Sequence, residues 1–102
     1  MIASFSIVPL DAGEELKEKI ADIVPLIERS GLNYVLGAMQ TTIEGDSMSV
    51  MDLIMKCHQH MRTTSRRVLT HITIDDREVA VDRLRGKVRD VETLLGRSVS
   101  HE

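Results

Sequence analysis

The sequence has almost no aromatic residues: one Phe, one Tyr and no Trp among 102 residues. Proteins that bind single-stranded nucleic acid stack its bases on aromatic side chains, and this chain has too few for such a surface. The formal net charge of −3 also provides no basic footprint for nucleic acid or an anionic membrane. We therefore expect an aliphatic core and a partner that is neither a nucleic acid nor a membrane.

Cysteines and long apolar runs are equally scarce. Cys57 is the only cysteine, so the chain cannot form an internal disulfide or its own thiolate metal cluster. Its position in a helical apolar stripe favours a small buried residue over a nucleophile. No run approaches the roughly 20 apolar residues that span a bilayer, and the first residues lack the basic segment of a signal peptide. The expected location is therefore cytoplasmic.

Motifs for nucleotides, nucleophilic catalysis and metals are missing as well. The patterns GxGxxG, GxxxxGK[ST] and GxSxG do not occur. His58 and His60 are two residues apart on a predicted helix and do not share a face, unlike the i, i+4 pair of a zinc helix. His71 could complete a metal site with His58 or His60 only by reaching across the sheet, because the helices are expected on the other face. We expect no metal and no cofactor.

Carboxylates at strand ends are the remaining candidates for acid–base catalysis. They are Glu44, Asp46, Asp75 and Asp76. Helix capping explains Asp46, and turn formation explains Asp75 and Asp76. We therefore expect no catalytic residues and a protein that is not an enzyme.

Alternation and helical periodicity predict the elements of the fold. Strands are expected at residues 2–8, 33–36, 39–44 and 67–75, with helices after Asp11, after Asp46 and before Gly96. Asp11 and Glu14 form an acidic variant of the capping box, and Asp46 or Ser47 caps the second helix. The predicted core stripe of the first helix is Leu16, Ile20, Ile23, Val24 and Ile27, and that of the second helix is Val50, Leu53, Ile54, Cys57 and Met61. The stripe of the last strand is Val68, Thr70, Ile72 and Ile74, and that of the last helix is Leu84, Val88, Val91 and Leu95. A second stripe on the middle helix, Met51, Met55 and His58, predicts burial on two sides.

The order βαββαβ predicts an α+β, ferredoxin-like fold with an extra C-terminal helix. Residues 1–96 form one domain and residues 97–102 a flexible tail. Both crossover helices cover one face of a four-stranded antiparallel sheet. The other face should carry small or mildly polar side chains: Ser4, Ser6, Val8, Leu69, His71 and Thr73. Because this face lacks the charges of a solvated surface and the last helix has a spare apolar stripe, we expect a homodimer or homotetramer.

Short segments along the whole chain carry a family resemblance. They are residues 7–10 (Ile-Val-Pro-Leu), 30–32 (Ser-Gly-Leu), Tyr34, Met39, Thr41, 43–46 (Ile-Glu-Gly-Asp), 67–68, 72–77 and 86–88. In this order and spacing the chain resembles the small thiamine-binding protein family. The family pattern has a glycine after the hairpin methionine, where this chain has Gln40. The side chain of Gln40 therefore projects at a position where the family glycine would leave the backbone exposed.

The resemblance implies a ferredoxin-like fold and non-catalytic binding of thiamine or its hydroxymethylpyrimidine portion, in oligomers whose sheets stack. Side chains near the hairpin suit a flat aminopyrimidine and a cationic thiazolium. The candidate ligand-binding residues are Ser6, Asn33, Tyr34, Met39, Thr41, Thr42 and Glu44. Strand alternation allows only one of Thr41 and Thr42 to share a face with Ser6.

Two other functions remain open at this point. An oligomeric regulatory or structural module would resemble the amino-acid-sensing ferredoxin-like domains, which normally regulate an attached enzyme. A small ferredoxin-like enzyme would work at a subunit interface. A carrier, buffer or sensor of thiamine is the first hypothesis.

Overall fold

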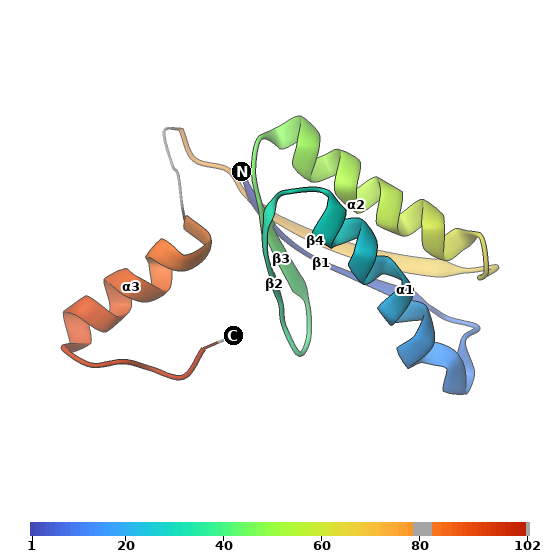
Figure 1. Cartoon of the computed structure of the whole chain (residues 1–102), viewed down its shortest axis with the longest axis horizontal. Coiled ribbons are helices and arrows are strands. Elements are labelled where there is room, and N and C mark those ends of the chain that lie inside the picture. Colours follow the sequence, from blue (N-terminus) through green and yellow to red (C-terminus); the bar gives the residue numbers. More distant parts are fainter. Residues whose placement is uncertain (79–82, 102) are drawn as a thin grey trace.

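The structure is a computed structural model that describes residues 1–78 and 83–101. Its elements are β1 (Ile2–Pro9), a 3-10 turn η1 (Gly13–Glu15), α1 (Leu16–Arg29), β2 (Asn33–Leu36), β3 (Thr41–Glu44), α2 (Ser47–Arg62), β4 (Val68–Asp75) and α3 (Arg83–Leu95). The strands form one antiparallel sheet in the order β2-β3-β1-β4, with α1 and α2 along one side (Figure 1). The ferredoxin-like α+β fold with an added C-terminal helix is confirmed.

The core lies between the sheet and the two crossover helices. Along β1 every second residue is buried, so Ala3, Phe5 and Ile7 point toward the helices. The other large buried side chains are aliphatic or sulfur-containing: Ile23, Ile27, Ile43, Val50, Leu53, Ile54, Cys57 and Met61. The predicted aliphatic core is confirmed. Burial raises the pKa of the Cys57 thiol to about 11.

Helix ends follow local signals in most places. Asp46 caps α2 by accepting a hydrogen bond from the Ser49 N–H at 2.9 Å, and hydrogen bonding by Ser49 lowers the pKa of Asp46. Gly31 and Gly96 follow α1 and α3 with φ of 75° and 71°, a left-handed conformation that ends helices.

The predicted capping box at Asp11 is wrong. The first helical turn follows Ala12 and has no side-chain cap. Asp11 instead accepts a hydrogen bond from the backbone N–H of Arg66 at 2.9 Å, which lowers the pKa of Asp11. The carboxylate of Asp11 is therefore hydrogen-bonded to Arg66, 55 positions away, instead of capping the helix. This bond connects the loop after β1 to the loop before β4.

Two predicted core residues of β4 lie outside the core. Ile72 and Ile74 are 40% and 45% exposed, although they point to the side of the sheet that the helices occupy. Because β4 is an edge strand, α2 does not cover it fully. Met51 and Met55 of α2, predicted to be buried, are 37% and 51% exposed.

The last helix stands apart from the two-layer body. Figure 1 shows α3 displaced from α1 and α2, and the radius of gyration of 15.0 Å exceeds the value of about 13 Å typical of a compact chain of 100 residues. Its predicted apolar stripe is only partly buried: Leu84 and Val88 are half-buried, while Val91 and Leu95 are exposed.

Candidate functional site

The face of the sheet opposite α1 and α2, called the open face, carries a row of hydroxyl groups. Ser4 on β1 pairs with Thr42 on β3 and with Thr73 on β4. Directly paired residues of antiparallel strands point to the same side, so these three hydroxyls lie side by side. We call Thr42, Ser4 and Thr73 the hydroxyl row.

A second row of the open face lies beside the hydroxyl row. Glu44 pairs with Asn33 of β2 and with Ile2 of β1, and Ile2 pairs with Asp75 of β4. One amide and two carboxylates therefore flank the three hydroxyls. Together the two rows offer hydrogen-bond donors, acceptors and negative charge within a small area.

A cavity of about 210 Å³ lies over the hydroxyl row. All three hydroxyl residues line it, together with Asp75, Arg77 and Lys87. Lys87 comes from α3, so the last helix supplies part of the wall. This volume is below the roughly 300–1,000 Å³ usual for small-molecule sites. The cavity has room for a single ring, and a larger ligand needs further walls.

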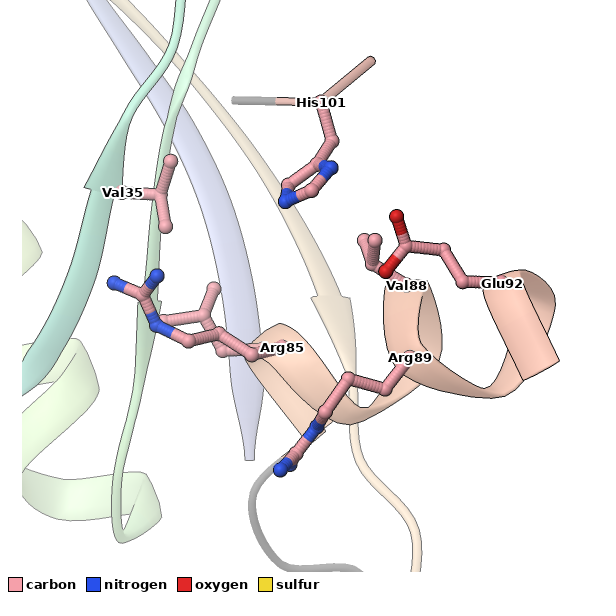
Figure 2. A pocket seen from close by; sticks show the side chains of 7 residues that line it. Val35, Arg85, Val88, Arg89, Glu92 and His101 are labelled. Carbon is pink, nitrogen blue, oxygen red and sulfur yellow. The ribbon is translucent and has the colours of Figure 1, made fainter. Parts of the chain in front are cut away.

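A neighbouring cavity of about 260 Å³ lies between β2 and α3. Val35, which pairs with Thr42, is one wall, and α3 and the tail supply the others (Figure 2). Figure 2 shows the side chains of Glu92 and His101 beside the same space. The tail is held here because Glu92 Oε2 accepts a hydrogen bond from the Val99 N–H at 2.8 Å.

Glu44 connects the open face to α3. Its side chain is half-buried, and Oε1 accepts a hydrogen bond from the backbone N–H of Leu84 at 3.3 Å. A carboxylate at the first turn of a helix also interacts favourably with the helix dipole. Glu44 therefore helps to place Lys87, one turn further along α3, over the hydroxyl row.

Gln40 lies over the open face. The Ser4 hydroxyl donates a hydrogen bond to Gln40 Oε1 at 2.6 Å. The side chain that stands in place of the family glycine thus reaches the hydroxyl row. A ligand that uses Ser4 must compete with this bond or share it.

The predicted ligand-binding residues separate into two groups. Ser6, Asn33, Thr42 and Glu44 lie on the open face, with Ser6 one row away from the hydroxyl row. Thr41 and Tyr34 lie on the other face, where Thr41 is buried and Tyr34 packs against the core. Met39 is in the hairpin loop and is 87% exposed. The structure therefore places four of the seven residues on one face of the sheet, but only Thr42 lines the cavity, and Tyr34, Met39 and Thr41 lie elsewhere.

Sequence reasoning did not assign five polar residues of the cavity wall to a ligand site: Ser4, Thr73, Asp75, Arg77 and Lys87. Alternation had placed Ser4 and Thr73 on the open face, but their alignment depends on strand register. The approach of Lys87 depends on the position of α3, for which the sequence gives no signal.

Two further properties concern only the described part of the chain. Residues 1–78 and 83–101 contain no group of three or more His, Cys, Asp or Glu side chains placed to hold a metal ion. The same residues include no helix that is both long and apolar enough to span a membrane.

Comparison with known proteins gives relatives over nearly the whole chain. A family model described as "Thiamine-binding protein" matches residues 3–92. A UPF0045 protein of Mycobacterium bovis is 32% identical over 96 residues, which cover 93% of this chain and 94% of that protein.

Solved structures share the fold. A hypothetical protein of Methanocaldococcus jannaschii superposes with a TM-score of 0.81 at 22% identity, over 88% of this chain and 93% of that chain. A Thermotoga maritima protein, named for a suggested role in thiamine biosynthesis or salvage, superposes with a TM-score of 0.78 at 23% identity, over 88% of this chain and 96% of that chain.

Proposed function

Since the chain belongs to the thiamine-binding protein family, we propose that it binds thiamine or the hydroxymethylpyrimidine portion of thiamine without catalysing a reaction. The proposed site is the cavity over the hydroxyl row. The observation that carries this proposal is the alignment of three hydroxyls beneath a small cavity, flanked by an amide and two carboxylates.

The chemistry of the cavity matches the two halves of thiamine. An aminopyrimidine is flat and has donor and acceptor edges, and hydroxyls can both donate to it and accept from it. The thiazolium is cationic, so the carboxylate of Asp75 at the cavity and that of Glu44 in the neighbouring row provide attraction. Lys87 and Arg77 lie at the same cavity and offer positive charge to the phosphates of a phosphorylated form.

The proposal includes self-association. The cavity has the size of one ring, and the apolar side chains of α3 are largely uncovered, with Leu94 88% exposed. A second copy stacked on the open face would cover α3 and add walls to the site. Light scattering at micromolar concentration should give a mass of at least two chains, and a monomer of 11.4 kDa would contradict this part.

The proposed role is that of a cytoplasmic carrier, buffer or sensor. A thermal-shift screen with thiamine, its phosphates, hydroxymethylpyrimidine and amino acids tests it against a regulatory module. Stabilisation by thiamine compounds alone supports the proposal, whereas stabilisation by an amino acid alone favours the regulatory module. Turnover of any of these compounds would contradict the non-catalytic role.

The position of the site is tested by removing one hydroxyl. Thr73→Val keeps the shape of the side chain and loses a hydrogen bond worth about 0.5–1.5 kcal/mol, so pyrimidine affinity should fall about 2- to 12-fold. Ser6→Ala is the matched control, because Ser6 is on the same face but outside the cavity wall. Equal losses in both variants would place the ligand further along the face.

A further inference from the structure

The cavity between β2 and α3, called the second cavity, is separate from the cavity over the hydroxyl row. None of residues 1–78 and 83–101 lines both of them. The Leu84 N–H is hydrogen-bonded to Glu44 of β3, so the start of α3 lies over β3. In the sheet order β2-β3-β1-β4, the second cavity is on the β2 side of α3, whereas the hydroxyl row extends to β1 and β4 on the other side. A ligand in one cavity therefore leaves the other cavity unfilled.

Aliphatic side chains form part of the wall of the second cavity. Val35 of β2 and Leu84 and Val88 of α3 line it, and all three are half-buried. Leu84 and Val88 have the i, i+4 spacing that puts side chains on the same side of a helix. Such residues can cover the apolar body of a ligand, as they do in most small-molecule pockets. The volume of about 260 Å³ limits that body to the size of a single ring.

Positive charge predominates among the charged groups of the second cavity. Arg85 and Arg89 line it and also have the i, i+4 spacing on α3. Among the described lining residues only Glu92 carries a carboxylate, and its Oε2 accepts a hydrogen bond from the Val99 N–H at 2.8 Å. The charge at this cavity is therefore opposite in sign to the net charge of −3 of the whole chain.

Arg85 is the group best placed to receive an anion. Figure 2 shows its side chain extending toward Val35. Arg85 has no hydrogen-bond or ion-pair partner among residues 1–78 and 83–101, whereas Arg89 already has an interaction within the chain. A guanidinium presents paired N–H donors that match the oxygens of a carboxylate or a phosphate. The second cavity thus combines an apolar wall with a cation that can bind an anionic head group.

The tail adds a polar wall. Gly96 has a φ of 71° and ends α3, and the bond between Glu92 and the Val99 N–H holds the following residues near the helix. His101 then lines the cavity, with Nδ1 2.8 Å from the carbonyl oxygen of Val99. Because a carbonyl oxygen only accepts, Nδ1 carries the proton of this hydrogen bond. The imidazole ring is therefore held at the cavity.

We propose that the second cavity is a binding site for a small organic anion, a carboxylate or phosphate ester with an apolar body of one ring. The body packs against Val35, Leu84 and Val88, and Arg85 binds the anionic head. Thiamine is not the ligand of this site, because its cationic thiazolium would meet the guanidinium groups. The site does not depend on the proposed thiamine site, since the two cavities have separate walls.

Calorimetric titration with benzoate and phenyl phosphate tests the class of ligand. At least one of these anions should bind with a dissociation constant of about 1 mM or lower, and neutral benzyl alcohol should bind at least roughly tenfold more weakly. Tighter binding of benzoate supports a carboxylate as the ligand, and tighter binding of phenyl phosphate supports a phosphate ester. The proposal is overturned if neither anion binds, or if benzyl alcohol binds equally well.

Removing single charges tests the position of the anion. Arg85→Gln should weaken the binding of the anion about tenfold, the value of one charge-assisted hydrogen bond. Lys87→Gln is the matched control, because Lys87 is a cation of the same helix that lines the other cavity, and this variant should keep the wild-type affinity. Circular dichroism verifies that both variants are folded. Equal losses in the two variants would place the anion over the hydroxyl row and contradict the proposal.

Amide chemical shifts locate the anion without any substitution. In ¹H–¹⁵N NMR spectra of the wild type, the anion that binds should shift the amide signals of Val35 and Val88 and leave those of Ser4 and Thr73 in place. Shifts confined to Ser4 and Thr73 would overturn the proposal.

Discussion

Replacing Glu44 by Gln removes one of the two negative charges that the proposed site offers to thiamine. The carboxylate is half-buried beside the hydroxyl row, and Oε1 accepts a hydrogen bond from the Leu84 N–H. Glutamine keeps an oxygen that can accept this bond, so α3 should stay attached. The negative charge alone is removed.

The expected loss follows from Coulomb's law. A pair of unit charges about 4 Å apart is worth about 1 kcal/mol in water and about 4 kcal/mol at the effective dielectric constant near a protein surface. For a half-buried carboxylate we expect an intermediate loss of about 1–3 kcal/mol, which weakens thiamine binding by about 5- to 150-fold. The neutral hydroxymethylpyrimidine should lose less, unless Glu44 accepts a hydrogen bond from its amino group.

Calorimetric titration of both ligands into wild type and Glu44→Gln measures these losses. Glu28→Gln removes the same charge from an exposed position on α1 and serves as the control. Unchanged thiamine affinity, in a Glu44→Gln variant that is folded and assembled like the wild type, would refute the reasoning and leave Glu44 a structural role, such as its contact with α3.

Three further predictions test the site and the core. Gln40→Ala should free the Ser4 hydroxyl and tighten pyrimidine binding by about 2- to 12-fold, the value of one hydrogen bond; unchanged affinity in calorimetry would place the ligand away from Ser4. Leu53→Ala, at a site only 4% exposed, should lower the free energy of unfolding in urea by about 2–5 kcal/mol, and Ile72→Ala should cost less because Ile72 is 40% exposed. Cys57 should resist alkylation at pH 8 until urea unfolds the chain, because a thiol with a pKa of about 11 has little thiolate; rapid reaction of the native protein would show that it is accessible.

Alternation within single strands was enough to assign side chains to the faces of the sheet. Ser4, Ser6 and Val8 lie on the open face as predicted, because successive side chains of a strand point to opposite sides. The cap at Asp46 was also predictable, since its hydrogen-bond partner is three residues away. Such features depend on neighbours in the sequence.

Contacts between distant segments were not predictable in the same way. The choice between Thr41 and Thr42 required the register of β3 on β1, which places Thr42 beside Ser4. Asp11 does not cap the helix that follows it, because its carboxylate accepts a hydrogen bond from the distant backbone N–H of Arg66. For Ile72, alternation gave the correct face, but only the width of the helical layer decides whether that face is covered at the sheet edge.

The cavity that we propose as the site was predictable only in part. The family resemblance and the side chains near the hairpin gave a ligand class and seven candidate residues, of which Thr42 lines this cavity. Lys87 was not found, because its place over the hydroxyl row depends on how α3 packs. Apolar periodicity predicts that α3 is a helix but gives no direction for it.

A crystal structure with hydroxymethylpyrimidine bound tests the central claim most directly. The account predicts ligand density over the hydroxyl row, within hydrogen-bond distance of Ser4, Thr42 or Thr73, in a crystal grown at saturating ligand. Density against Tyr34 and Thr41 on the helix-covered face would contradict it, as would an empty open face in a crystal whose protein binds the ligand in solution.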